Sequence, residues 1–297
     1  MRPVPYILFR YHLTDEGDDP ISPNVDREVI EGVRGKAAPY RTSDPNPDNY
    51  NNYVMRVRPE NIEGELVLIF DVGYRISHRV EHRWNRRKDE YDLVDVGADD
   101  TVFTRLVAIP RLRVIGAKDG AGDRLAATSA MARLKAIINT HSDYYFQYER
   151  TASQEDVEAA IARLRLTEFA FEVRPFNPHP KNPGEKLDEL LKVAHVQRFR
   201  GKAQASPTAK MNADDDGLIS EAIGLSKAGY GQFAVKGETE SGVVVSYAKP
   251  AFSAERDKNE AAAGRARAIK VAVPRDDPDM TEEEYVVRVI LELFGGR

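Results

Sequence analysis

The sequence of 297 residues contains no cysteine and a single tryptophan. The absence of cysteine excludes disulfide bonds, thiolate zinc sites, iron–sulfur clusters and cysteine nucleophiles. No apolar stretch approaches the ~18 residues that a membrane-spanning helix needs. The N-terminal apolar run is short and has no small-residue cleavage site, so we expect no signal peptide. These absences favour a cytoplasmic protein, and the many Ala, Arg and Asp residues suggest a bacterial one.

Signatures of catalysis are also missing. The chain has no G-x-x-x-x-G-K-[ST] loop and no G-x-S-x-G elbow. His78 to His82 matches the zinc pattern H-x-x-E-H, but that pattern needs a helix and its neighbours alternate as in a strand. Residues 212–217 begin like a calcium-binding loop, yet Ile223 stands where the twelfth position needs glutamate. We therefore predict no metal, no cofactor and no catalytic residue.

The composition is that of a folded protein, with 41% hydrophobic and 31% charged residues. The net charge is −5, so any binding to a polyanion must come from local basic patches. Between Leu68 and Trp84 every second residue is apolar, aromatic or histidine, while Arg75, Arg79 and Arg83 occupy three of the intervening positions. This alternation predicts a half-buried strand with one basic face.

The order of the expected elements predicts an α+β fold with three domains. Residues 1–120 form an antiparallel β-rich domain with a long polar insertion at 14–52, in which 29–33 is a candidate strand. Residues 121–205 read as a ferredoxin-like β–α–β domain. Residues 206–297 read as a small C-terminal α+β domain that ends in a helix from Thr281 to Phe294, where Thr281 and Glu284 have capping-box spacing.

Two basic stretches suggest contact with phosphates. Residues 75–88 carry six Arg or Lys against Glu81 alone, and residues 192–210 carry five and no acid. A third cluster is Arg265, Arg267 and Lys270. Arginine binds phosphate bidentately, and an aromatic ring can stack on a base. We predict that nucleic acid is bound by Arg75, Arg79, Arg83, Trp84, Arg86, Arg87, Lys88, Arg198, Arg200, Lys202, Tyr230 and Lys236.

The leading hypothesis is a non-catalytic RNA- or DNA-binding protein that forms part of a larger bacterial assembly, with antiviral defence or mobile elements as its setting. One alternative is a metal-dependent nuclease that uses Glu172 and an acid between 92 and 100. Another is a subunit that binds other proteins or itself and no nucleic acid. In the last case the arginine row is a solvated strand face, paired with acids from 89–100.

Overall fold

The computed structural model describes residues 3–15, 22, 24–39, 52–75, 79–85, 90–96, 101–119, 125–151, 154–175, 185–206, 211, 217–227, 230–248, 268–275 and 277–295; the side chains of 75–96, 154–156, 185 and 227 are outside the description. The predicted α+β class is confirmed. Eleven strands pair in an antiparallel sheet, two more form a hairpin, and the described part also contains six α-helices. Among the described helices, none is both long and apolar enough to cross a membrane.

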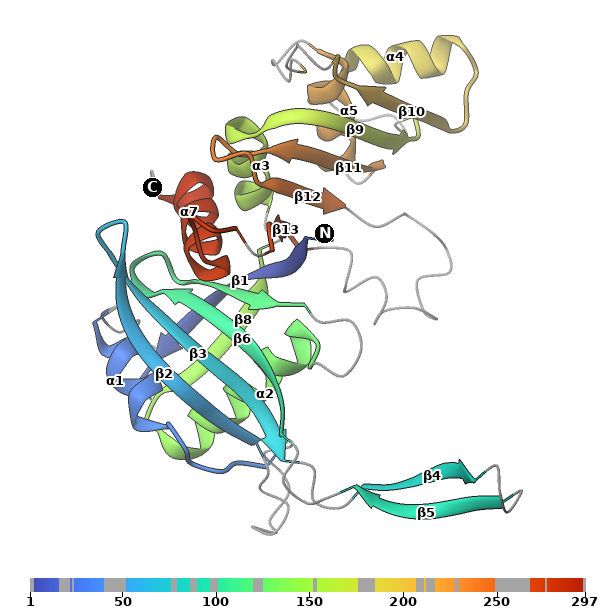
Figure 1. Cartoon of the computed structure of the whole chain (residues 1–297). Coiled ribbons are helices and arrows are strands. Elements are labelled where there is room, and N and C mark those ends of the chain that lie inside the picture. The colour runs from blue at the N-terminus through green and yellow to red at the C-terminus, as the bar shows by residue number, and fades with distance from the viewer. Residues whose placement is uncertain are drawn as a thin grey trace. The chain divides into compact units, whose positions relative to one another are not determined.

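The chain divides into two compact units (Figure 1). Unit 1 comprises residues 1–10 and 149–297, and unit 2 comprises residues 11–148. The first strand, β1 (Val4–Thr14), contributes its start to unit 1 and its end to unit 2. These two units do not show which segments fold independently, so the three-domain division stays a prediction.

Unit 2 is built on strands that follow the order β1-β7-β6-β3-β2, with β8 also paired to β1. Helix α2 packs against β2, β3, β6 and β7, and its buried side chains include Met131, Leu134 and Ile138. The elements of this unit are α1 (Val25–Gly32), β2 (Asn52–Ile62), β3 (Glu65–Arg75), β4 (Arg79–Asn85), β5 (Glu90–Val96), β6 (Thr101–Ile109), η2 (Pro110–Leu112), β7 (Val114–Lys118), α2 (Ala127–His141) and β8 (Tyr145–Arg150).

The predicted strand at 29–33 is wrong, because this segment belongs to helix α1. Asp26, Val29 and Ile30 are buried on one helical face, whereas Arg27 and Glu31 are exposed and form an i,i+4 ion pair at 3.0 Å. The apolar spacing is therefore that of an amphipathic helix.

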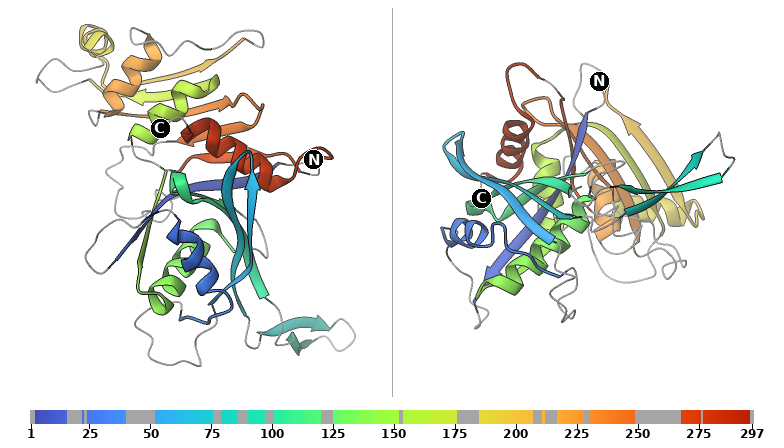
Figure 2. Two further views of the ribbon diagram at one scale, coloured as in Figure 1. Left: turned by 90° about the vertical axis from the view of Figure 1, so that its left-hand side faces the viewer. Right: turned by 60° about the horizontal axis from the view of Figure 1, so that its bottom comes forward.

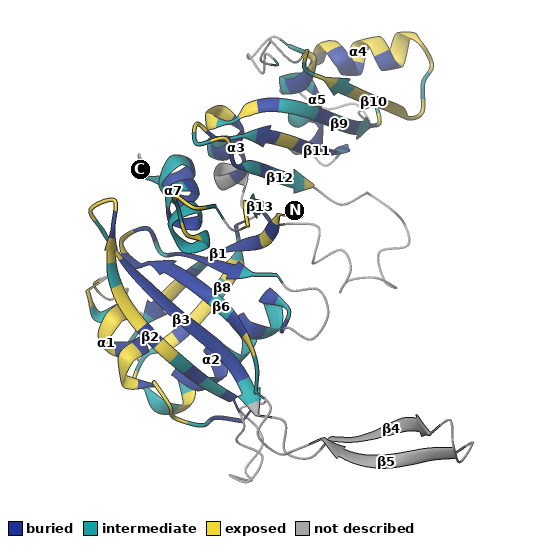
Figure 3. Ribbon diagram, in the orientation of Figure 1, coloured by how far each residue is buried: buried dark blue, intermediate teal, exposed yellow. Residues whose placement is uncertain are grey.

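The alternating stretch does form strands, namely β3 and β4. However, β3 is not half-buried, since every residue from Val67 to Gly73 is buried (Figure 3). Asp71 tolerates this burial because Arg56 and Arg105 each contact one of its carboxylate oxygens at 2.6 Å.

Unit 1 contains a sheet in the order β10-β9-β11-β12-β13-β1. Helices α3, α4 and α5 lie together on one side of it (Figure 2, left). Its elements are α3 (Gln154–Arg163), β9 (Arg165–Val173), α4 (Glu185–Val193), β10 (Phe199–Gln204), α5 (Leu218–Lys227), β11 (Gly231–Glu238), β12 (Val244–Ala248), β13 (Lys270–Val273) and α7 (Glu282–Phe294). The predicted β–α–β unit is present in chain order as β8, α3 and β9, but these two strands are not neighbours in the sheet.

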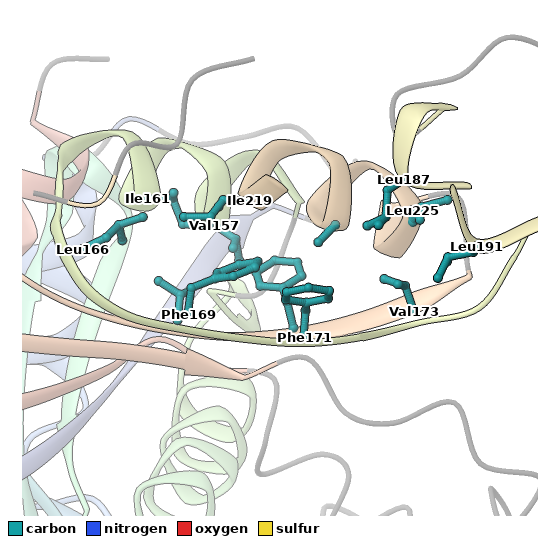
Figure 4. Packing of buried hydrophobic residues seen from close by; sticks show 13 residues of the cluster. Val157, Ile161, Leu166, Phe169, Phe171, Val173, Leu187, Leu191, Ile219 and Leu225 are labelled. Carbon is teal, nitrogen blue, oxygen red and sulfur yellow. The ribbon is translucent and has the colours of Figure 1, made fainter. Parts of the chain in front are cut away.

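The core of unit 1 lies between these helices and the strands (Figure 4). Phe169, Phe171 and Phe233 form its aromatic centre, with ring centroids 5.6 to 6.0 Å apart. Aliphatic residues of α3, α4 and α5 cover these rings. The last helix, α7, begins at the predicted capping box, in which the Thr281 hydroxyl accepts from the Glu284 backbone N–H at 3.2 Å.

Candidate nucleic-acid interface

One side of the unit 1 sheet packs on helices and the other meets solvent. Along β9, Phe169, Phe171 and Val173 are buried in the core, while Ala170 and Glu172 between them are half-buried. The same alternation on β10, β11, β12 and β13 assigns every second residue to the side opposite the helices. We call this side the exposed sheet face. Its charged residues are Arg165, Glu168, Glu172, Arg198, Arg200, Lys202, Lys236, Glu238 and Lys270.

Several cations of this face have carboxylate partners. Glu172 contacts the guanidinium of Arg198 at 3.2 Å and that of Arg200 at 2.5 Å. Lys202 pairs with Glu168 at 3.1 Å. The arginine and lysine side chains nevertheless remain 47%, 67% and 56% exposed, so each keeps donors in water. Exposed pairs of this kind contribute little to stability.

The two glutamates do not balance the cations. Arg165 and Glu238 pair with each other at 2.6 Å, which leaves five basic residues against two acidic ones over the rest of the face. The hydrogen bond from Lys202 lowers the pKa of Glu168, as does a weaker one from Gln204, so this carboxylate stays charged near neutral pH. The face is therefore basic overall.

Lys236 and Lys270 lie at the other end of the face. Strand register puts Lys236, Ser246 and Lys270 in one row across β11, β12 and β13. All three residues line a surface depression of about 390 Å³, together with Glu168 and Ala234. Within the described residues, no carboxylate lies within ion-pair distance of either lysine.

The structure thus brings together predicted site residues from separate parts of the sequence. Arg200 and Lys202 on β10 and Lys236 on β11 flank strand β9. Tyr230 is half-buried just before β11, where its carbonyl accepts from the Arg174 backbone N–H at 2.8 Å. Its predicted role in stacking stays a prediction.

Sequence reasoning did not select Ser246 or Lys270 as site residues. Lys270 was visible as part of the third basic cluster, and the alternation of Val271 and Val273 around Ala272 marked its strand. What the sequence did not reveal is that β13 pairs with β12, which puts Lys270 beside Ser246.

The other basic stretch lies mostly outside the described side chains. Arg86, Arg87 and Lys88 are not described at all, and Arg75, Arg79, Arg83 and Trp84 are described as backbone only. The register of the β4–β5 hairpin puts Arg83 opposite Asp92. The phosphate-binding role of this stretch stays a prediction.

Glu172 is the acid of the nuclease alternative, and its carboxylate contacts two guanidinium groups. Both of its oxygens contact an arginine, so a metal ion would have to compete with these two cations. The acids between 92 and 100 that the nuclease alternative also needs lie outside the described side chains. No group of three or more His, Asp or Glu side chains able to hold a metal occurs among the residues whose side chains are described.

A buried polar cluster in unit 2 links helix α1 to β1. Asp26 is fully buried, accepts a short hydrogen bond from the Tyr11 hydroxyl, and lies 3.2 Å from an Arg113 nitrogen. Burial raises the pKa of Asp26 to about 6, against the lowering effects of Tyr11 and Arg113. Burial also raises the pKa of Tyr11. We assign this cluster a structural role, because Tyr11 and Asp26 are fully buried.

No protein-family model and no curated protein matches this chain.

Proposed function

We propose that this protein binds nucleic acid without cleaving it and that the exposed sheet face of unit 1 is its contact surface. The observation that carries the proposal is the excess of Lys and Arg over Glu on this solvent-facing sheet. Lysine and arginine that contact backbone phosphates release counterions, and this release drives binding that does not depend on sequence.

The small residues at the centre of the face support the same function. Ala170 and Ala234 lie directly opposite each other on β9 and β11, and Ala248 lies opposite Ala234 on β12. Because these side chains are short, a polymer backbone can approach the sheet closely between the lysines and arginines that surround them. Arg200 and Lys202 are on the edge strand β10, where charged side chains also hinder pairing with another sheet.

The test is fluorescence anisotropy with four labelled probes: single-stranded and duplex RNA, and single-stranded and duplex DNA. We expect micromolar binding of at least one probe, with affinity that falls steeply as salt rises from about 50 to about 200 mM. Failure to bind any of the four probes at the lower salt concentration would refute the function.

A pair of matched variants locates the surface. Lys202→Glu with Lys236→Glu should weaken binding by about tenfold or more, because both charges are reversed beside the bound phosphates. Lys36→Glu with Lys135→Glu makes the same charge change at two exposed lysines of unit 2 and should have a much smaller effect. Equal losses in the two variants would show that the exposed sheet face is not the contact surface. Arg83→Glu with Arg87→Glu tests the 75–88 stretch separately.

A further inference from the structure

The row Lys236–Ser246–Lys270 has the chemistry of a phosphate site. Two ammonium groups flank a hydroxyl, and the three side chains line one depression. Lys236 and Lys270 are separated by one intervening strand, so their Cα atoms are about 9.6 Å apart at the usual strand spacing. A four-carbon stem lets each ammonium group reach an anion held above Ser246, whose hydroxyl can donate a third hydrogen bond.

The surroundings determine where such an anion binds. Glu168 lies beside Lys236 in the same row, but it already accepts hydrogen bonds from Lys202 at 3.1 Å and Gln204 at 3.4 Å. On the other side of Ser246, the row continues through Lys270 to Ile7, which carries no charge. Lys270 is therefore the lysine of this row that lies farther from Glu168.

The lysines and arginines follow one line over the sheet, which runs along β10 and then turns across the strands. This line runs from Arg200 and Lys202 on β10, past Lys236 on β11, to Lys270 on β13. One line of positive charge fits one phosphate backbone, whereas a duplex presents two. The strand positions of this face in β9 to β13 carry no aromatic side chain, so they offer no platform for base stacking.

We infer that Lys236, Ser246 and Lys270 form a phosphate-binding subsite that holds the sugar–phosphate backbone of a single strand lying across the sheet. This inference rests on the proposed function and adds the ligand group, the strandedness and the residues. It implies that the subsite contacts phosphates and does not distinguish between bases.

The first experiment compares a mixed-sequence single strand with an abasic strand of the same length, which keeps the sugars and phosphates and lacks bases. We expect dissociation constants within about threefold of each other, because the strand positions of the face offer no stacking. Much weaker binding of the abasic strand would show that the protein contacts bases and would overturn the inference. Inorganic phosphate serves as competitor. Displacement of the strand by phosphate at comparable concentration would mean a small-anion site, which also contradicts the inference.

The second experiment measures the salt dependence of binding for Lys236→Gln with Lys270→Gln, and separately for Ser246→Ala. Each lost phosphate contact should make the slope of log K against log salt less negative by about 0.7, so the double variant should change it by about 1.4. Lys36→Gln with Lys135→Gln is the matched control and should keep the wild-type slope. Circular dichroism confirms that each variant is folded.

The outcomes separate the two proposals. Salt-dependent binding by the wild type with an unchanged slope in the double variant overturns the subsite and leaves the proposed function intact. Absence of binding by the wild type refutes the proposed function and the subsite with it. A reduced slope in the double variant, with a smaller loss of affinity in Ser246→Ala, supports the subsite.

Discussion

Glu172→Gln distinguishes a binding surface from a nuclease site. The Glu172 carboxylate holds Arg198 and Arg200 and adds negative charge to the exposed sheet face. Glutamine keeps the shape of the side chain and one acceptor oxygen but removes the charge. If this surface binds nucleic acid, the substitution frees two guanidinium groups and should increase affinity. If Glu172 is instead a metal ligand of a nuclease, the same substitution should abolish magnesium-dependent cleavage.

The size of the expected change in affinity follows from the charges. A carboxylate about 6 Å from a bound phosphate repels it by about 0.7 kcal/mol in a water-like dielectric, so its removal should tighten binding about threefold. Two freed arginines should also steepen the slope of log K against log salt by up to about 1.4. The fold should be little affected, because ion pairs with such exposed arginines contribute at most about 1 kcal/mol.

The assay is anisotropy with a single-stranded probe over a range of salt concentrations, together with a gel assay for cleavage with and without magnesium. Glu60→Gln is a matched control, since it removes a partly exposed glutamate that contacts Arg58 in unit 2. Weaker binding by Glu172→Gln, with stability unchanged, would contradict our view that Glu172 competes with phosphate. Magnesium-dependent cleavage by the wild type that disappears in the variant would establish the nuclease.

Three further predictions concern stability. The folded chain keeps a proton on Asp26 up to a pKa of about 6, whereas the unfolded chain releases it near the ordinary value of 3.8, so the free energy of unfolding should fall by up to about 3 kcal/mol as pH rises between these values. The difference in unfolding free energy between wild type and Asp26→Asn, measured by urea titration at several pH values, should show this dependence, and a constant difference would contradict it. Phe169→Ala should destabilise the protein by about 3–5 kcal/mol in the same assay, because the Phe169 ring is fully buried against Phe171 and Phe233. Thr281→Ala should cost about 1 kcal/mol and Thr281→Ser much less, since serine retains the cap; equal losses would mean that the capping hydrogen bond is not the cause.

The elements that could be predicted from the sequence are those in which buried apolar residues recur at regular spacing within one segment. The C-terminal helix, for example, has its capping box and apolar face in one stretch of sequence. Strand β10 gave no such signal. Its inward positions are Phe199, Gly201 and Ala203, and the two small residues do not alternate visibly with the polar ones. Gly201 is required there, because a Cβ atom would lie 2.5 Å from the Phe171 ring.

The site was predictable in part. The basic residues of 192–210 and Lys236 were visible as charges, but their spatial neighbours were not. Glu172 and Arg200 are 28 positions apart in sequence, and they meet because β9 and β10 pair in one particular register. Strand order and register depend on contacts between distant segments, so one sequence does not reveal which cations are paired or that Lys236 shares a depression with Lys270.

The distribution of aromatic rings is consistent with our proposal that this surface binds phosphates and not bases. In sheets that bind single-stranded RNA by stacking, aromatic side chains point from the strands toward solvent. Here Phe169, Phe171 and Phe233 point toward the helices, and Phe199 and Tyr247 contact them with ring centroids 5.6 Å apart. Phe169, Phe171 and Phe233 are buried in the core, and Phe199 is on the same side of the sheet with 38% of its surface exposed. The opposite side has short side chains, lysines and arginines together with three glutamates, and its excess of positive charge is the basis of the proposed phosphate binding.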